Sequence, residues 1–436
     1  MTETARPQFN PFAPGFTEDP YPQYAALRDG DPVHRTAIGT WLVTRYEDVS
    51  RLLRGGLSVE RRNISPDSPL VQRRQELYGG RETRRMRCPS MLDRDAPDHT
   101  RLRRLVAKAF TPRAIDALRP WVTGLVDDLL DAMEAAGRRA DLVESLASPL
   151  PFTVIAGMLG APPADHERIR RLSGTLVRGL EPVASPGAAD AIVAADEAMT
   201  GIAGEMIAWK RKHPGDDMLT TLIQAEDEGD TLTDDELVSQ TLLLYIAGHE
   251  TTVNLLAGGA LALLRSPGQL AILLGKPAVI PNAVEELLRY DSPVQLGRRI
   301  TTEPVTVGGT KIPAGELVTV GLAAANRDER YWGPDAAELR VERENARQHV
   351  SFGAGPHHCL GAYLARMEAA VAFERLLARF PRLSLDGDVT WNGRVNLRGP
   401  AHLPVLARLG RERAGAGSTV TSRGRRSARR TAASRC

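Results

Sequence analysis

A single cysteine in a loop rich in glycine and proline constrains this chain more than any other feature. Residues 351–361 read Ser-Phe-Gly-Ala-Gly-Pro-His-His-Cys-Leu-Gly, and a strongly helical run follows. Gly353 and Gly355 let the backbone turn sharply and approach a flat partner without side-chain clash. A cysteine at a helix entrance meets backbone N–H dipoles, so the sequence predicts a lowered pKa and a thiolate at Cys359. Three roles are open at this point: a buried structural cysteine, a catalytic thiol and an axial ligand to haem iron.

The pattern around the cysteine favours the third role. Read as Phe-Gly-x-Gly-x-His-x-Cys-x-Gly, residues 352–361 resemble the haem-binding signature of the cytochrome P-450 family at every specified position. Gly353-x-Gly355 lacks the third glycine of a dinucleotide-binding loop and follows no convincing βαβ pattern. The resemblance implies that Cys359 is the metal ligand, the proximal thiolate of a haem b iron, whose chemistry favours O–O cleavage. It also implies haem contacts from four further residues, namely Phe352, Gly353, His357 and Gly361.

Composition and cysteine content are those of an ordinary globular protein. The chain has 436 residues, of which 42% are hydrophobic and 25% charged, with a net charge of +2. No segment looks like a linker, so we expect one large domain. Three cysteines cannot form a disulfide framework in a chain of this size, which indicates a reducing compartment. Residues 1–24 contain neither an apolar signal region nor a membrane anchor, so we expect a soluble, cytoplasmic protein. The near-neutral charge gives no argument for nucleic-acid binding.

The N-terminal quarter is expected to contain short elements and one long loop. We expect residues 1–20 to form an extended arm, followed by a helix around Tyr21–Asp29, a strand at Trp41–Thr44 and a helix over Tyr46–Leu53. Residues 55–90 are rich in Gly, Pro and Arg without clear periodicity, which predicts a long loop. By resemblance this loop forms part of the roof over the haem and contributes to substrate choice. A mobile surface loop is the alternative.

The segment Asp98–Phe110 predicts a helix with a polar pair on its apolar side. At about 100° per residue, His99 and Arg103 share one side with Val106 and Phe110. An unpaired buried arginine is costly, so such a pair needs a buried anion. Haem propionates would supply one through charge-assisted hydrogen bonds. The resemblance assigns His99 and Arg103 to the propionates and places Phe110 beside the cofactor; an ordinary i,i+4 pair at the helix rim is the alternative.

The opposite side of that helix carries a basic stripe, Arg101, Arg104 and Lys108. It is either a solvated face or a docking surface for an acidic electron donor, and the resemblance favours the second. Residues 113–230 read as amphipathic helices interrupted near Gly137, at 161–163 and at 181–189. By analogy with the family, a helical hairpin around residues 165–210 forms a lid over the distal pocket.

The longest predicted helix begins at a capping box, with Thr233 at the N-cap and Glu236 at the third helical position. Residues 237–264 are apolar on nearly all faces, which predicts a buried helix. A glutamate near the middle, Glu250, argues against a membrane span because a central acid is costly in lipid. Val253 stands where a zinc protease would have its second histidine.

The middle of this helix, Ala247-Gly248-His249-Glu250-Thr251, resembles the distal oxygen-binding motif of the family. The resemblance implies that Ala247 and Gly248 leave room beside the iron. It further implies that Thr251 orients water and donates a hydrogen bond, and that Glu250 relays protons as a general acid. The alternative is a threonine bonded to its own helix beside a satisfied core glutamate. His249 is expected to face away from the iron.

The C-terminal part carries a structural ion pair and a further basic residue. Glu286-x-x-Arg289 on a helix is an i,i+3 pair, and the ordered string after it resembles the family's buried Glu–Arg pair, completed by Arg343. The same string places Arg299, not Arg298, at the propionate-binding position, by its distance from Pro293. Short strands are expected over 304–320 with a hairpin turn at Gly308-Gly309. Residues 395–397 are expected to form a turn at the wall of the pocket.

The resemblance covers about residues 10–410 and implies a mainly α single domain with small β-sheets, the cytochrome P-450 fold. Residues 411–436 are basic and poor in apolar residues, which predicts a disordered tail. The implied reaction inserts one oxygen atom from O2 into a small organic substrate, in secondary metabolism by analogy. Electrons would come from NAD(P)H through a ferredoxin reductase and a ferredoxin. The alternatives are a haem-thiolate enzyme of coupling, desaturation or peroxide chemistry, and a non-catalytic haem protein.

Overall fold

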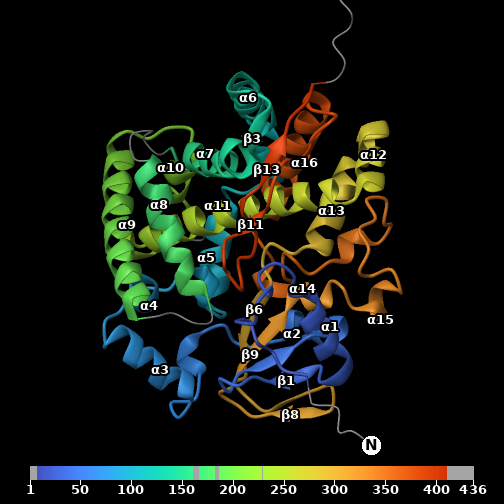
Figure 1. Ribbon diagram of the computed structural model, residues 1–436. Coiled ribbons are helices and arrows are strands. Elements are labelled where there is room, and N and C mark those ends of the chain that lie inside the picture. Colours follow the sequence, from blue (N-terminus) through green and yellow to red (C-terminus); the bar gives the residue numbers. More distant parts are fainter. Residues whose placement is uncertain (1–6, 161–165, 182–185, 228, 410–436) are drawn as a thin grey trace, which may run out of the picture.

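The computed structural model describes residues 7–160, 166–181, 186–227 and 229–409. This part of the chain is mainly helical, as the sequence predicts (Figure 1). The α-helices are α1 Tyr21–Gly30, α2 Tyr46–Arg54, α3 Pro69–Tyr78, α4 Arg84–Arg87, α5 Asp98–Ala107, α6 Pro112–Ala136, α7 Pro149–Leu159, α8 His166–Leu176, α9 Pro186–Lys212, α10 Met218–Ile223, α11 Asp234–Leu264, α12 Pro267–Gly275, α13 Ile280–Tyr290, α14 Leu322–Ala325, α15 Glu329–Trp332 and α16 Ala362–Arg379.

The strands form small sheets. They are β1 Val33–Arg35, β2 Trp41–Val43, β3 Arg139–Asp141, β4 Glu226–Asp227, β5 Asp230–Thr231, β6 Leu296–Ile300, β7 Val305–Val307, β8 Thr310–Ile312, β9 Leu317–Gly321, β10 Ser384–Leu385, β11 Thr390–Trp391, β12 Pro400–His402 and β13 Pro404–Leu406. The largest described sheet has the order β1-β2-β9-β6, with β2 parallel and β6 antiparallel to β9. A second sheet has the order β10-β13-β3, which joins the C-terminal strands to the end of α6.

Helix α11 runs through the middle of the molecule, and the other large helices pack around it (Figure 1). The predicted capping box is confirmed: Thr233 Oγ1 accepts the Glu236 N–H at 3.2 Å, and the Glu236 carboxylate accepts the Thr233 N–H at 2.9 Å. Most of α11 is buried, as its all-round apolar composition predicts. A Cβ at Gly259 would lie 2.9 Å from the Phe373 ring, so glycine permits the close approach of α16.

Within the described residues, no single helix is long and apolar enough to cross a membrane. Helices α11 and α12 reach that length and composition only when taken together, and they are bent by 104° at their junction.

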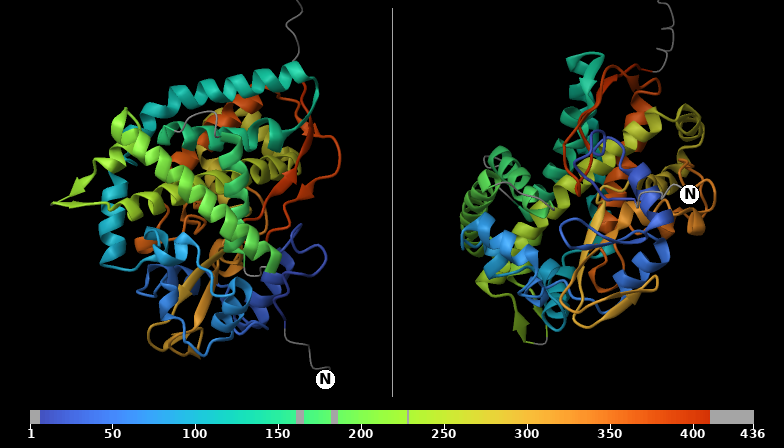
Figure 2. Two further views of the ribbon diagram at one scale, coloured as in Figure 1. Left: turned by 90° about the vertical axis from the view of Figure 1, so that its left-hand side faces the viewer. Right: turned by 60° about the horizontal axis from the view of Figure 1, so that its bottom comes forward.

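The predicted helical hairpin consists of α8, the 3-10 turn Val177–Leu180 and α9. Helices α8 and α9 pack on each other, and both contact α11. Figure 2 shows α9 crossing one side of the molecule in front of α11. The break predicted at Gly137 is confirmed, since α6 ends at Ala136. The break at 161–163 lies outside the described residues, and the third break is shorter than predicted because α9 already begins at Pro186.

Two expectations for the N-terminal part are wrong. Residues 55–90 are not one long loop, because they contain α3, α4 and the 3-10 turn Arg61–Asn63. None of the α3 residues is buried, so this helix has no hydrophobic periodicity to reveal it; its signals are Pro69 at its start and Gly79, with φ 55°, after its end. The described part of the N-terminal arm is not extended either: residues 11–18 form turns, and Phe16 is buried against Tyr24.

Other local predictions are confirmed. Strands β7 and β8 form a hairpin in which Gly308 and Gly309 have φ values of 54° and 82°, the turn geometry that glycine pairs favour.

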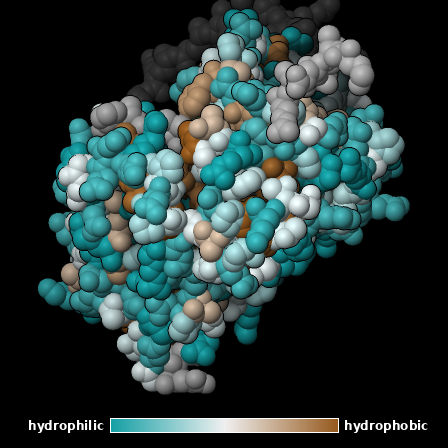
Figure 3. Space-filling view, turned by 90° about the horizontal axis from the view of Figure 1, so that it is seen from below, coloured by the Kyte–Doolittle hydropathy of each residue, from teal (hydrophilic) through white to brown (hydrophobic). Residues whose placement is uncertain are grey.

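The face seen from below, where α3 and β8 lie, is mainly hydrophilic, and hydrophobic residues appear there only as small separate areas (Figure 3).

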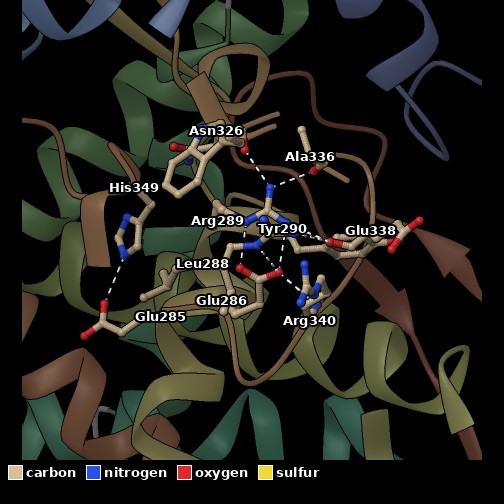
Figure 4. Close-up of polar contacts among 12 residues, drawn as sticks. Glu285, Glu286, Leu288, Arg289, Tyr290, Asn326, Ala336, Glu338, Arg340 and His349 are labelled. Carbon is tan, nitrogen blue, oxygen red and sulfur yellow. Dashed lines mark hydrogen bonds and ion pairs between the residues drawn. The ribbon is translucent and has the colours of Figure 1, made fainter. Parts of the chain in front are cut away.

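A fully buried ion pair ties α13 to the segment after α15 (Figure 4). The Arg289 Nε and Nη2 atoms donate to the two Glu286 oxygens at 2.7 and 2.8 Å, and Arg343 Nε donates to Glu286 at 3.1 Å. The remaining Arg289 donors bind the backbone oxygens of Asn326, Ala336 and Glu338. Because every buried charge here has a partner, the network is stable only as a whole.

We therefore predict that Arg289→Lys lowers the free energy of unfolding by about 3 kcal/mol, since a lysine cannot replace the donors that Glu286 and the three carbonyls require. Arg347→Lys is the control, because Arg347 is largely exposed, and we expect a change below about 0.5 kcal/mol. Equal losses in urea denaturation of the two variants would contradict the structural role of the Glu286–Arg289 pair.

Candidate active site

The loop before α16 is shaped by two glycines in the left-handed region. Gly353 and Gly355 have φ values of 68° and 71°. A Cβ at Gly355 would lie 2.7 Å from the Leu53 carbonyl oxygen at the end of α2, so glycine is required there on two grounds. The Cys359 N–H donates to the Phe352 oxygen at 2.9 Å, which closes the loop. Gly361 has no such requirement, since a Cβ there would meet nothing within 4 Å.

Charged groups from α13 and α16 support this loop from behind. The Arg366 guanidinium donates to both Glu285 oxygens, at 2.8 and 3.1 Å, and lies 4.5 Å from the centre of the Phe352 ring. His349 Nε2 lies 3.1 Å from Glu285 (Figure 4). Burial raises the pKa of Glu285, but the hydrogen bonds from His349 and Arg366 outweigh it and bring the pKa to about 2. The position of Phe352 before the cysteine is thus fixed by a paired carboxylate.

The predicted lowering of the Cys359 pKa is wrong for the protein as described. Burial raises the pKa of the thiol, and the Gly361 N–H and the Arg103 charge only partly offset it. Helix α16 begins at Ala362, three residues after the cysteine, so its dipole acts from a distance. Yet the Cys359 residue is solvent-accessible. Because this cysteine is accessible, its sulfur can bind a metal ion. A bound metal stabilises the thiolate and so offsets the effect of burial.

Four basic side chains lie beside the cysteine, and we call them the proximal basic set: His99, Arg103, Arg299 and His357. The His99 and His357 rings have centroids 4.1 Å apart, and Arg103 Nη2 donates to the His358 oxygen at 2.7 Å. The pKa of His357 falls to about 4, because of burial first and then the charges of His99 and Arg299. Burial likewise lowers the pKa of Arg299 to about 10, with Arg298 as the next cause.

This set has donors but no carboxylate. Over the described ranges, none of its four members forms an ion pair with an acidic side chain, and the His99 Nε2 atom is buried without a hydrogen-bond partner. The neighbouring Arg298 differs, because its Nη2 donates to Asp93 at 2.6 Å. The two arginine charges and the imidazole donors, without a bound carboxylate, fit an anionic group that binds beside Cys359. The two carboxylates of a haem have this charge and chemistry, so the residues present fit a haem-thiolate site.

Two details of α5 differ from the predictions. The helix ends at Ala107, so Phe110 lies beyond it and packs, partly buried, against the main hydrophobic core. Arg101 does not belong to a free basic surface, because it forms ion pairs with Asp230 and Glu236. Arg104 and Lys108 are exposed as expected.

The middle of α11 is more accessible than its surroundings. Ala247 is exposed, and Gly248, Glu250 and Thr251 are half-buried, although the neighbouring turns of the helix are buried. The Thr251 hydroxyl donates to the Ala247 oxygen at 2.8 Å, a bond within its own helix. A Cβ at Gly248 would lie 3.4 Å from Ile155, so this glycine sits at the contact with α7.

Glu250 is held by a residue that the sequence analysis missed. Its carboxylate accepts from Arg394 Nη1 at 2.6 Å, and the two residues are 144 positions apart. Arg394 directly precedes the turn predicted at 395–397, and the N–H groups of that turn donate to the Glu181 carboxylate at 2.8 to 3.3 Å. No local pattern signals either contact, because the partners come from distant parts of the chain.

His249 points into the core rather than toward an accessible surface. It is buried, and its ring lies 5.4 Å from the Phe152 ring in an edge-to-face arrangement. Burial lowers its pKa, with the Glu250 charge acting in the opposite direction.

Comparisons with known proteins agree with this site. The family profile described as Cytochrome P450 matches residues 278–392, which include the Cys359 loop. The cytochrome P450 monooxygenase PikC of Streptomyces venezuelae is 43% identical over 91% of this chain and 93% of its own. The mycinamicin IV hydroxylase/epoxidase of Micromonospora griseorubida is 39% identical over 88% of this chain and 94% of its own. The solved structure of PksS, a cytochrome P450 of Bacillus subtilis, matches with a TM-score of 0.82 and 36% identity over 92% of this chain and all of its own.

The fold, the cysteine loop and these relatives together define a haem-thiolate protein of bacterial type. The chain belongs to the cytochrome P450 family and is a P450 monooxygenase.

We predict that His249→Leu makes the protein less sensitive to acid. The folded-state pKa of His249 lies below the ordinary value of 6.5, so the unfolded state takes up the proton first and stability is lost as pH falls below 6.5. The variant lacks this loss, and the slope of Tm against pH between 6.5 and 5 becomes shallower. His213→Leu, a change at an exposed residue, is the control. An unchanged slope in His249→Leu would show that the pKa of His249 is not lowered in the folded protein.

Proposed function

We propose that this enzyme inserts one oxygen atom from O2 into a small organic substrate, by hydroxylation or epoxidation, as a step of secondary metabolism. The observation that carries the proposal is the accessible Cys359 thiol beside four basic groups that have no carboxylate partner. Relatives whose names specify a hydroxylase/epoxidase and a polyketide-pathway P450 support the reaction type and the setting.

Each site residue has a part in this proposal. Cys359 holds the haem iron as a thiolate, and the proximal basic set binds the haem propionates. The haem is further contacted by Phe110, Ala247, Gly248, Phe352, Gly353 and Gly361. When bound, a thiolate-ligated haem supplies the cleavage of the O–O bond.

The distal residues are assigned to proton delivery. The hydroxyl proton of Thr251 is donated to the Ala247 oxygen in this structure. After rotation about χ1, the hydroxyl can instead orient water or donate to the reacting oxygen. Glu250 forms an ion pair with Arg394. When water replaces Arg394 as its partner, the carboxylate can carry protons inward. This acid–alcohol pair favours O2 activation over a peroxide-driven reaction.

Electrons are proposed to come from NAD(P)H through a ferredoxin reductase and a ferredoxin, in the cytoplasm. Arg104 near the end of α5, Lys108 directly after it and Arg101 are the candidates for docking an acidic ferredoxin, because surface charges of opposite sign steer association. We further propose that residues 1–410 form one domain; the basic tail predicted at 411–436 lies outside the described residues.

The carbon monoxide difference spectrum of the dithionite-reduced protein tests the ligand assignment. We expect a strongly red-shifted Soret band in the wild type, and its loss in Cys359→Ser because an alcohol does not replace the thiolate. Cys88→Ser is the matched control, since Cys88 lies in the roof region away from the α16 loop, and it should keep the band. A red-shifted band in Cys359→Ser would remove the haem-thiolate assignment.

We also predict that Thr251→Ala separates electron use from product formation. The variant should still consume NAD(P)H in the presence of redox partners and substrate, but release peroxide and form at least about tenfold less product. Thr252→Ala is the control, because Thr252 is the neighbouring threonine of the same helix and is buried, whereas Thr251 is half-buried. Full coupling in Thr251→Ala would show that another group delivers the proton.

A further inference from the structure

Two arginines from separate elements bind the Asp93 carboxylate, and the charge of this carboxylate also acts on two further arginines. We call them the roof arginines: Arg61 in the 3-10 turn 61–63, Arg74 in α3, Arg85 in α4 and Arg298 in β6. Arg85 donates to both Asp93 oxygens, at 2.6 and 3.0 Å, and Arg298 Nη2 donates to the same carboxylate at 2.6 Å. These bonds occupy the Asp93 carboxylate, so the set keeps a surplus of positive charge, although the Asp196 charge also acts on Arg85 and the Glu82 charge on Arg74.

The other two roof arginines have no acidic partner. Across the described part of the chain, neither Arg61 nor Arg74 forms an ion pair, and the Arg298 Nε atom is buried without a hydrogen-bond partner. Burial and then the charges of Arg298, Arg85 and Arg74 lower the pKa of Arg61 to about 9, although its side chain is solvent-accessible. An exposed guanidinium beside like charges is available to donate hydrogen bonds to an anion.

The segment that carries Asp93, the acid bound by Arg85 and Arg298, packs on the first half of α11. The Met91 N–H donates to the Gln240 side chain at 3.2 Å, and Ser239 Oγ donates to the Cys88 oxygen at 2.8 Å. These contacts anchor the Asp93 segment about two turns before the accessible Ala247. Helices α3 and α4 both contact α9, a helix of the lid hairpin (Figure 1).

The set is distinct from the proximal basic set. Arg298 and Arg299 are consecutive in β6, and consecutive side chains in a strand point to opposite faces. Arg298 reaches Asp93, whereas the Arg299 charge acts on His357. The charges that act on Arg61 come from the other roof arginines and Asp93, and not from the residues around Cys359. Haem propionates bound by the proximal basic set would therefore leave the excess positive charge of the roof arginines unpaired.

The planar guanidinium donates two parallel hydrogen bonds to carboxylate and phosphate groups, and several of them around one point bind an oxyanion strongly. We propose that the roof arginines bind an oxyanion of the substrate, a carboxylate or a phosphate, so that this monooxygenase acts on anionic organic molecules. This inference rests on the proposed function, because it assigns the substrate class of the same site.

Calorimetric titration of the full-length, haem-loaded protein with inorganic pyrophosphate at low ionic strength tests the anion site. Arg61→Gln and Arg74→Gln should each weaken binding at least about tenfold, because each removes a guanidinium of the set. Arg73→Gln is the matched control, since Arg73 is the exposed neighbour of Arg74 on α3, and it should bind within about twofold of the wild type. Equal affinities in all three variants, or no binding to the wild type, would overturn the proposal.

A second titration distinguishes a substrate group from a free inorganic anion. Dodecyl phosphate carries the oxyanion on an organic chain, so we expect it to perturb the Soret band of the wild type and of Arg73→Gln. In Arg61→Gln, the same change of the band should require at least about tenfold more dodecyl phosphate. If pyrophosphate binds at the roof arginines but dodecyl phosphate leaves the band unchanged, or shifts it equally in all variants, the substrate assignment is wrong and the site serves a free anion. Pyrophosphate binding does not depend on the iron ligand, so its failure is separable from a failure of the carbon monoxide spectrum.

Discussion

Two adjacent carboxylates on α13 carry the constraint on which the rest of the site depends: a buried charge must be fully paired. Glu286 accepts from Arg289 and Arg343, which joins α13 to the segment after α15. Glu285 accepts from His349 and Arg366, which joins the same helix to both sides of the cysteine loop. The loop that presents Cys359 is therefore held by ion pairs rather than by regular secondary structure.

Two groups of charges do not meet this pairing rule, and they mark the functional surfaces. The proximal basic set and the roof arginines both have more positive groups than acids, and strand β6 contributes one arginine to each. Glu285 and Glu286 are both fully paired. We therefore infer that the unpaired cations occur where a bound ligand supplies the missing anion. We infer two anions of different origin, the haem propionates near Cys359 and an acidic group of the substrate under the lid hairpin.

Sequence reasoning was most accurate where the determining contacts are local. The capping box at Thr233 and Glu236 involves residues three positions apart, and the hairpin at Gly308-Gly309 needs only the conformational freedom of glycine. It failed for α3, which buries none of its residues and so shows no periodicity. It also failed for Arg101, because the acids that occupy it come from β5 and α11.

By itself, the sequence determined the family, the cysteine loop and the buried central helix, since a motif of ten residues and an apolar run are written in consecutive positions. Only the tertiary structure decided which charges meet. The Glu250–Arg394 pair, the binding of Asp93 by Arg85 and Arg298, and the raised pKa of Cys359 depend on distances through space and on burial. Electrostatic energy follows those two quantities, and neither can be read from separation along the chain.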